Sequence, residues 1–165
     1  MIPFALAASL ALAAAPESTV YELPVGSFSV KPDTVRDAPT TEVAVVLVIE
    51  PGNVRHYRMD RKVTDRQGKA VQSSADSRTC PALMRELAKV EALPMPRFAA
   101  PGSKALATAA IVMHSATYTL AMRGYESGSN TTADIALSAQ GASPLAQWTE
   151  TTLTALEPCW TARVS

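Results

Sequence analysis

The segment VAVVLVIEPGNVRHYRMDRKV, residues 43–63, decides the fold of this 165-residue chain. Its first part, Val43–Ile49, is apolar at every position and rich in β-branched side chains, which predicts a buried central strand. The residues Pro51–Asn53 predict a turn. From Val54 to Val63 apolar and polar side chains alternate, so the second strand has one face in water. The segment therefore predicts an antiparallel hairpin.

A helix is predicted directly downstream, after a polar segment over residues 65–77 that predicts a loop or a frayed extension of the hairpin. Pro81 suits the first helical position, and Leu83, Leu87 and Val90 recur at helical spacing. The helix is expected to stop before Pro94. Residues 94–108 contain three prolines and one glycine, so a long surface loop is expected there.

The second half of the chain repeats this pattern. Residues 110–122 predict a long strand, and the alternation over residues 133–139 predicts its partner, with a turn between them. Ser143 and Pro144 have the residue types of a helix start, and Pro158 follows the last turn of the helix. The expected order of elements is hairpin, helix, hairpin, helix.

The first 15 residues, MIPFALAASLALAAA, have the layout of a secretory signal peptide. They combine an apolar run, too short for a membrane span of about 20 residues, with small residues at the end. We expect cleavage between Ala13 and Ala14. Residues 16–42 are rich in proline and predict an extended arm or an edge strand. Residues 43–165 predict a single globular α+β domain.

Cys80 and Cys159 are the only cysteines, and in an oxidising compartment they are expected to form a disulfide bond. Such a bond requires α-carbons within about 7 Å. It would place the start of the first helix beside the end of the second, with the two helices antiparallel on one face of the sheet. The predicted fold is therefore a two-layer α+β sandwich, a mostly antiparallel sheet of four to five strands with two helices in the order ββα-ββα.

The charge balance and the hydropathy exclude some classes of protein. Lysine and arginine number 15, as do aspartate and glutamate, which argues against a dedicated nucleic-acid binder. No segment after residue 15 is apolar enough to span a bilayer, so no transmembrane span is expected once the leader is removed.

Motifs for catalysis are absent from the sequence. It contains no Gly-x-Ser-x-Gly elbow, no His-Glu-x-x-His helix and no glycine-rich phosphate loop. We therefore assign no catalytic residue, metal ligand or cofactor. The two histidines, His56 and His114, are expected to be a solvated residue and a hydrogen-bonded core residue respectively.

The basic stretch around the second strand is the main candidate for a contact surface. It comprises Arg55, His56, Arg58, Arg61 and Lys62. On a strand, His56, Arg58 and Lys62 share one face, whereas Arg55 and Arg61 point the other way. These residues could bind an envelope protein, an anionic glycan or a lipid surface. Alternatively, they are solubilising charges on an edge strand.

Two functions follow as hypotheses. The first, which we favour, is an exported bacterial envelope protein, periplasmic or secreted, that acts as a non-enzymatic binding domain. The alternative is a small periplasmic hydrolase whose site is assembled from scattered residues around His114 or His56. A histidine that lines a pocket beside an acidic group would favour the hydrolase.

Overall fold

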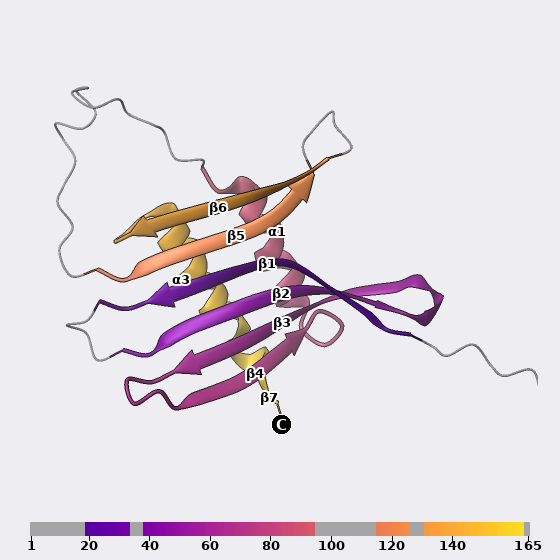
Figure 1. The fold of residues 1–165 in the computed structure, drawn as a ribbon, viewed down its shortest axis with the longest axis horizontal. Coiled ribbons are helices and arrows are strands. Elements are labelled where there is room, and N and C mark those ends of the chain that lie inside the picture. The colour runs from indigo at the N-terminus through magenta and orange to yellow at the C-terminus, as the bar shows by residue number, and fades with distance from the viewer. Residues whose placement is uncertain (1–18, 34–37, 95–114, 126–130, 164–165) are drawn as a thin grey trace, which may run out of the picture.

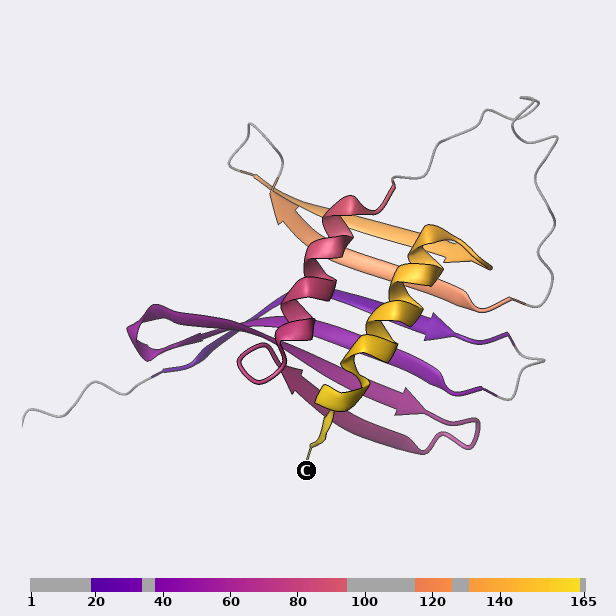
Figure 2. The same ribbon diagram turned by 180° about the vertical axis from the view of Figure 1, so that it is seen from behind.

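The computed structural model describes residues 19–33, 38–94, 115–125 and 131–163. Within them, seven antiparallel strands form one sheet in the order β6-β5-β1-β2-β3-β4-β7 (Figure 1). The strands are β1 (Tyr21–Lys31), β2 (Thr40–Glu50), β3 (Val54–Thr64), β4 (Ala70–Asp76), β5 (Thr117–Tyr125), β6 (Thr132–Gln140) and β7 (Thr161–Ala162). The α-helices of the described residues, α1 (Pro81–Ala88) and α3 (Pro144–Leu156), lie side by side on one face of the sheet (Figure 2). Short 3₁₀ turns η1 (Pro51–Asn53), η2 (Lys89–Ala92) and η3 (Glu157–Cys159) complete the described elements.

The predicted sheet of four to five strands in the order ββα-ββα is wrong. Four strands precede α1, and a seventh strand follows α3. Two segments account for most of the difference. Residues 70–76, expected to belong to a loop or a frayed extension of the hairpin, form a regular strand, β4, that pairs with β3. Residues 21–31, expected to be an arm or an edge strand, form β1 in the middle of the sheet, between β2 and β5.

Proline is accommodated in the interior strand β1 by an irregularity in the backbone. The register between β1 and β2 shifts between Pro24 and Gly26, which is where a residue without an N–H donor is tolerated. Glycine is needed at position 26 for a separate reason, which is the packing of β1 against β5. A β-carbon at this position would lie 2.8 Å from the carbonyl oxygen of Ala121 and closer still to the sulfur of Met122. The close approach of β5 to β1 therefore requires glycine.

The core lies between the sheet and the two helices. Phe28 and Val45 contribute from the sheet, and Leu83 and Trp148 contribute from the helices. The rings of Phe28 and Trp148 meet edge to face, with their centroids 5.1 Å apart. The indole Nε1 of Trp148 donates a hydrogen bond of 3.1 Å to the carbonyl oxygen of Glu86, which links α3 to α1.

The helix starts and the disulfide bond agree with the sequence predictions. The Ser143 hydroxyl accepts a hydrogen bond of 3.1 Å from the Ala146 amide, and Pro144 is the first helical residue. Cys80 and Cys159 form a disulfide bond, and their α-carbons are 5.8 Å apart. The bond joins the start of α1 to the turn that follows α3.

The leader predicted over residues 1–15 and its cleavage site lie outside the described residues. None of the helices in the described part of the chain has the length and hydropathy needed to cross a bilayer.

Candidate functional site

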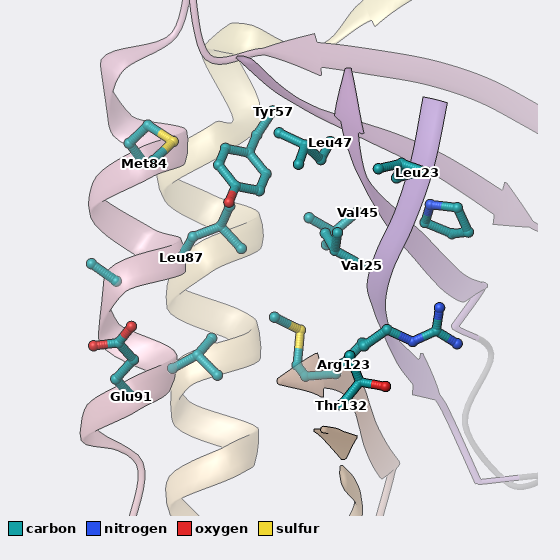
Figure 3. Close-up of a pocket in the computed structure, with 14 residues that line it drawn as sticks. Leu23, Val25, Val45, Leu47, Tyr57, Met84, Leu87, Glu91, Arg123 and Thr132 are labelled. Carbon is teal, nitrogen blue, oxygen red and sulfur yellow. The ribbon is translucent and has the colours of Figure 1, made fainter. Parts of the chain in front are cut away.

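An apolar groove runs beside α1 on the helical face of the sheet, and we call it the α1 groove (Figure 3). Its volume is about 660 Å³, within the range of about 300–1,000 Å³ that is typical of ligand pockets. The wall is formed by α1 and η2 through Met84, Leu87, Ala88 and Val90. The floor is formed by four strands through Leu23, Val25, Val45, Leu47, Tyr57 and Met122.

No element among the described residues covers this groove on the side of α1 away from α3. Leu83 faces the core and is fully buried, whereas Met84 is 45% exposed. Met84, Leu87 and Ala88 recur at helical spacing, so α1 has an apolar stripe on the groove side as well as on the core side. On the floor, Leu23 is 47% exposed. Apolar side chains left in contact with water on two facing elements are typical of a binding surface.

The polar groups of the α1 groove gather at one end. Glu91 on the helical side, Arg123 at the end of β5 and Thr132 at the start of β6 lie there, and Met84 and Tyr57 lie at the other end (Figure 3). The Arg123 Nε atom is 3.2 Å from the Asp134 carboxylate, and both side chains are more than half exposed. Glu91 forms no ion pair with any residue in the described part of the chain.

The predicted contact residues are divided between the two faces of the sheet. The register with β2 places His56 beside Val48 and Arg58 beside Val46, on the face without helices, and Lys62 shares that face. We call it the open face. Arg55 and Arg61 point to the helical face, as the alternation predicts. Nothing in the structure tests whether these residues bind a partner, so the contact surface stays a prediction.

Arg58 is held in an ion-pair network on the open face. Its two terminal nitrogens each donate a hydrogen bond of 2.8 Å to the Glu22 carboxylate, and it also contacts Asp60 at 3.0 Å. Arg163 lies 3.5 Å from the same aspartate. The hydrogen bonds from Arg58 lower the pKa of Glu22, and those same bonds raise the pKa of Arg58. The positive charge of Arg58 is therefore compensated within the chain.

The other three cationic side chains of the basic stretch also have partners. Arg61 stacks at 4.5 Å over the ring of Trp160 and forms an ion pair of 2.8 Å with Glu157. Lys62 lies 3.8 Å from Glu42. Arg55 donates a hydrogen bond of 3.1 Å to the Asn53 side chain. Among the described residues, the stretch therefore offers less unpaired charge than its sequence suggests.

His56 is a buried residue with an acidic neighbour, and it is not the solvated side chain that was expected. Its side chain is 5% exposed, and Nε2 lies 3.3 Å from the Asp76 carboxylate. Nδ1 is buried without a hydrogen-bond partner in the described structure. Neither His56 nor Asp76 lines the α1 groove. His114, the other predicted histidine, lies outside the described residues.

Arg78 is the cationic side chain that most strongly lowers the pKa of Asp76. It contacts the Asp76 carboxylate at 2.8 Å and the Glu50 carboxylate at 2.7 Å. Burial alone would raise the pKa of Asp76, but the hydrogen bonds from Arg78 and the nearby His56 outweigh it, so the pKa lies below its ordinary value. A carboxyl group with a depressed pKa stabilises the fold above its unfolded pKa of about 4, and this stability is lost as the pH falls through the folded value.

The acid stability of the protein should therefore depend on Asp76. We expect Asp76→Asn to be less stable than the wild type at pH 7 and to lose less stability between pH 7 and pH 3. Urea unfolding at the two pH values measures this difference. Asp134→Asn is the matched control, because the Asp134 side chain is 75% exposed. An equal loss between the two pH values for Asp76→Asn and the wild type would contradict the prediction.

The α1 groove is not among the sites predicted from the sequence. The apolar residues Met84, Leu87 and Ala88 are visible in the sequence beside the core position Leu83, and they widen the apolar stripe of the helix. A helix with an apolar surface wider than one packing face is the signal that could have revealed the groove. No group of three or more potential metal ligands occurs among the residues that the structure describes.

Comparison with known proteins found no matching family model, no matching curated protein and no matching solved structure.

Proposed function

We propose that this chain is an exported, non-enzymatic binding domain of the bacterial cell envelope, which holds the apolar face of a helix from a protein partner in the α1 groove. The observation that carries the proposal is the groove itself, about 660 Å³ of space between the uncovered stripe of α1 and the floor of the sheet. An apolar surface of this kind on a folded domain usually marks an interaction site.

The disulfide bond supports a location outside the cytoplasm. Such bonds persist in the periplasm and in secreted proteins and are rare in the reducing cytoplasm. Together with the leader predicted over residues 1–15, the bond favours a periplasmic or secreted protein. Sequencing of the amino terminus of the mature protein tests this part separately, since export predicts a start at Ala14.

A helix is the occupant that fits the position of the groove. The helices α3 and α1 lie side by side on the sheet (Figure 2). The α1 groove adjoins α1 and has no residue of α3 in its lining. Its wall carries Met84, Leu87 and Ala88 at the spacing with which helices pack against each other. A partner helix would complete the layer in the same way that amphipathic helices fill apolar grooves in other complexes.

The charged end of the groove sets the orientation of the partner. Because Glu91 has no ion-pair partner in the described structure, we expect the bound helix to carry a lysine or arginine at one end of its apolar stripe. A small ligand fits the groove less well. Pockets for small ligands hold a few convergent polar groups, whereas here Arg123 is exposed and already paired with Asp134.

Site-specific photocrosslinking in the native cell envelope tests the proposal. A photoreactive amino acid at Met84 should give a discrete protein adduct that maps to an apolar segment with helical spacing. The same amino acid at Val71, which is 60% exposed on β4 and outside the groove, should give none. Identical adducts from both positions, or no adduct from Met84, would reject the α1 groove as the binding site.

The variant Met84→Glu should weaken partner binding about tenfold, because it places a charge against the apolar stripe of the bound helix. The measurement is the yield of the adduct formed from a photoreactive residue at Leu23, on the opposite side of the groove. Fluorescence of a hydrophobic dye such as anilinonaphthalene sulfonate should also fall. Val71→Glu is the matched control and should change neither signal.

The hydrolase alternative rests on the contact between His56 and Asp76. Neither residue lines the α1 groove, and the His56 side chain is 5% exposed, so a substrate would have little access to it. The binding surface predicted at Arg58 and Lys62 is likewise a weaker candidate than the α1 groove, because carboxylates of this chain already compensate both charges. Both remain predictions, and we base the proposed function on the groove.

A further inference from the structure

The strand β6 forms one edge of the sheet, and the structure shows no strand beyond it in the described part of the chain. Its sequence, TADIALSAQ, contains no proline and a single charge, Asp134, which forms an ion pair with Arg123. The outer edge of such a strand presents a row of unpaired N–H and C=O groups. Proteins usually protect an edge of this length with lysine, proline or a bulge, and β6 has none of the three in its register with β5.

The opposite edge of the sheet is protected. There, β4 pairs with the two-residue strand β7, and the Arg163 amide donates a hydrogen bond of 3.2 Å to the Gln72 carbonyl. Arg163 also brings its positive charge to this edge, near Asp60. In the described part of the chain, the sheet therefore has one edge with a strand of only two residues and one edge of nine residues that is open to pairing.

We infer that β6 pairs with β6 of a second copy of this chain, antiparallel, about a two-fold axis at Ala136. Ala136 is the central residue of the nine in β6. In this register Ile135 of one copy lies opposite Leu137 of the other. Both side chains are on the helical face, where Ile135 is paired with Met122 and Leu137 with Leu120 of β5. The pairing covers Ile135, which is 44% exposed in the single chain.

The remaining pairs across the axis are compatible with this register. Asp134 lies opposite Ser138 of the second copy, and Thr132 lies opposite Gln140, so no like charges meet. The formal net charge of the chain is zero, so two copies approach without long-range repulsion. Because the two-fold pairing uses the β6 edge of both copies, the association ends at a dimer and does not continue as a fibre. The inference does not depend on the α1 groove.

Size-exclusion chromatography with light scattering, over a series of concentrations, tests this inference on the mature chain. We expect the measured mass to rise to twice that of one chain as the concentration increases. Hydrogen exchange should show that the amides of β6 become protected over the same range. A mass of one chain at every concentration would overturn the inference.

Two variants locate the axis. Ala136→Glu places two negative charges against each other at the axis, and Ala136→Lys places two positive charges there. Each should shift the dimerisation midpoint to higher concentration by about fivefold or more, and an equimolar mixture should restore the dimer. Ala121→Glu is the control, because Ala121 is paired with Ala136 on the neighbouring strand β5 and does not face the second copy. If the mixture of Ala136→Glu and Ala136→Lys stayed monomeric while Ala121→Glu formed dimers, the two-fold axis would not lie at Ala136.

Discussion

Removal of the disulfide bond should lower the free energy of unfolding by about 4 kcal/mol. The bond joins residues separated by 79 positions, and the entropy gained by an unfolded chain on opening a loop of that length gives this value as an upper figure. Small domains have a total stability of about 5–15 kcal/mol, so the loss is a large fraction of the whole. The bond also fixes the start of α1, which forms the wall of the α1 groove.

The double variant Cys80→Ala/Cys159→Ala is the substitution to use, because Cys80 is 1% exposed and alanine adds no buried polar group. Urea unfolding of this variant and of the wild type, each with and without a thiol reductant, measures the effect. The reductant should destabilise the wild type to the level of the variant and leave the variant unchanged. Equal unfolding midpoints for the oxidised wild type and the variant would show that the bond contributes little.

The parts of the fold that the sequence predicts well are those with strong local patterns. The apolar run Val43–Ile49 lies within β2, and the alternation from Val54 to Val63 lies within β3. Ser143 begins α3 as a cap, and the two cysteines form the expected bond. In each case the signal is contained in the residues themselves, as an apolar run, an alternation, a capping side chain or a pair of thiols.

The number and order of the strands could not be predicted in this way. The segment Ala70–Asp76, AVQSSAD, is too polar to resemble a strand, and it becomes β4 because β3 offers it a backbone edge over seven residues. Pro24 argues against an interior strand, yet the shift in register between Pro24 and Gly26 accommodates it. Pairing with a neighbour outweighs local preference in both segments.

The candidate site depends on contacts between residues that are distant in the sequence. Glu22 compensates the charge of Arg58 across 36 positions, and Glu157 compensates that of Arg61 across 96. The charge of a basic stretch cannot be assessed without these contacts. The wide apolar surface of α1 is a local signal for the α1 groove, but the floor of the groove is assembled from four strands that are distant in the sequence.

Substitution of Trp148 by alanine should be as damaging as loss of the disulfide bond, with an expected cost of about 3–5 kcal/mol. Trp148 is 6% exposed and lies between the sheet, where it meets Phe28, and α1, where it donates a hydrogen bond to the Glu86 carbonyl. Truncation to alanine therefore opens a cavity at the junction of both layers and also breaks the link between the two helices.

Trp148→Phe reduces the loss of packing, because it keeps an aromatic ring against Phe28, but it removes the indole N–H group and the second ring of the indole. We expect it to cost about 1–2 kcal/mol, clearly less than alanine. Urea unfolding followed by far-ultraviolet circular dichroism measures both variants without relying on Trp148 fluorescence. Equal losses for phenylalanine and alanine would mean that the hydrogen bond between the helices, and not the filling of the core, accounts for the effect. Since that bond ties α1 to α3, Trp148→Phe would then also be the variant in which binding at the α1 groove falls while most of the core remains filled.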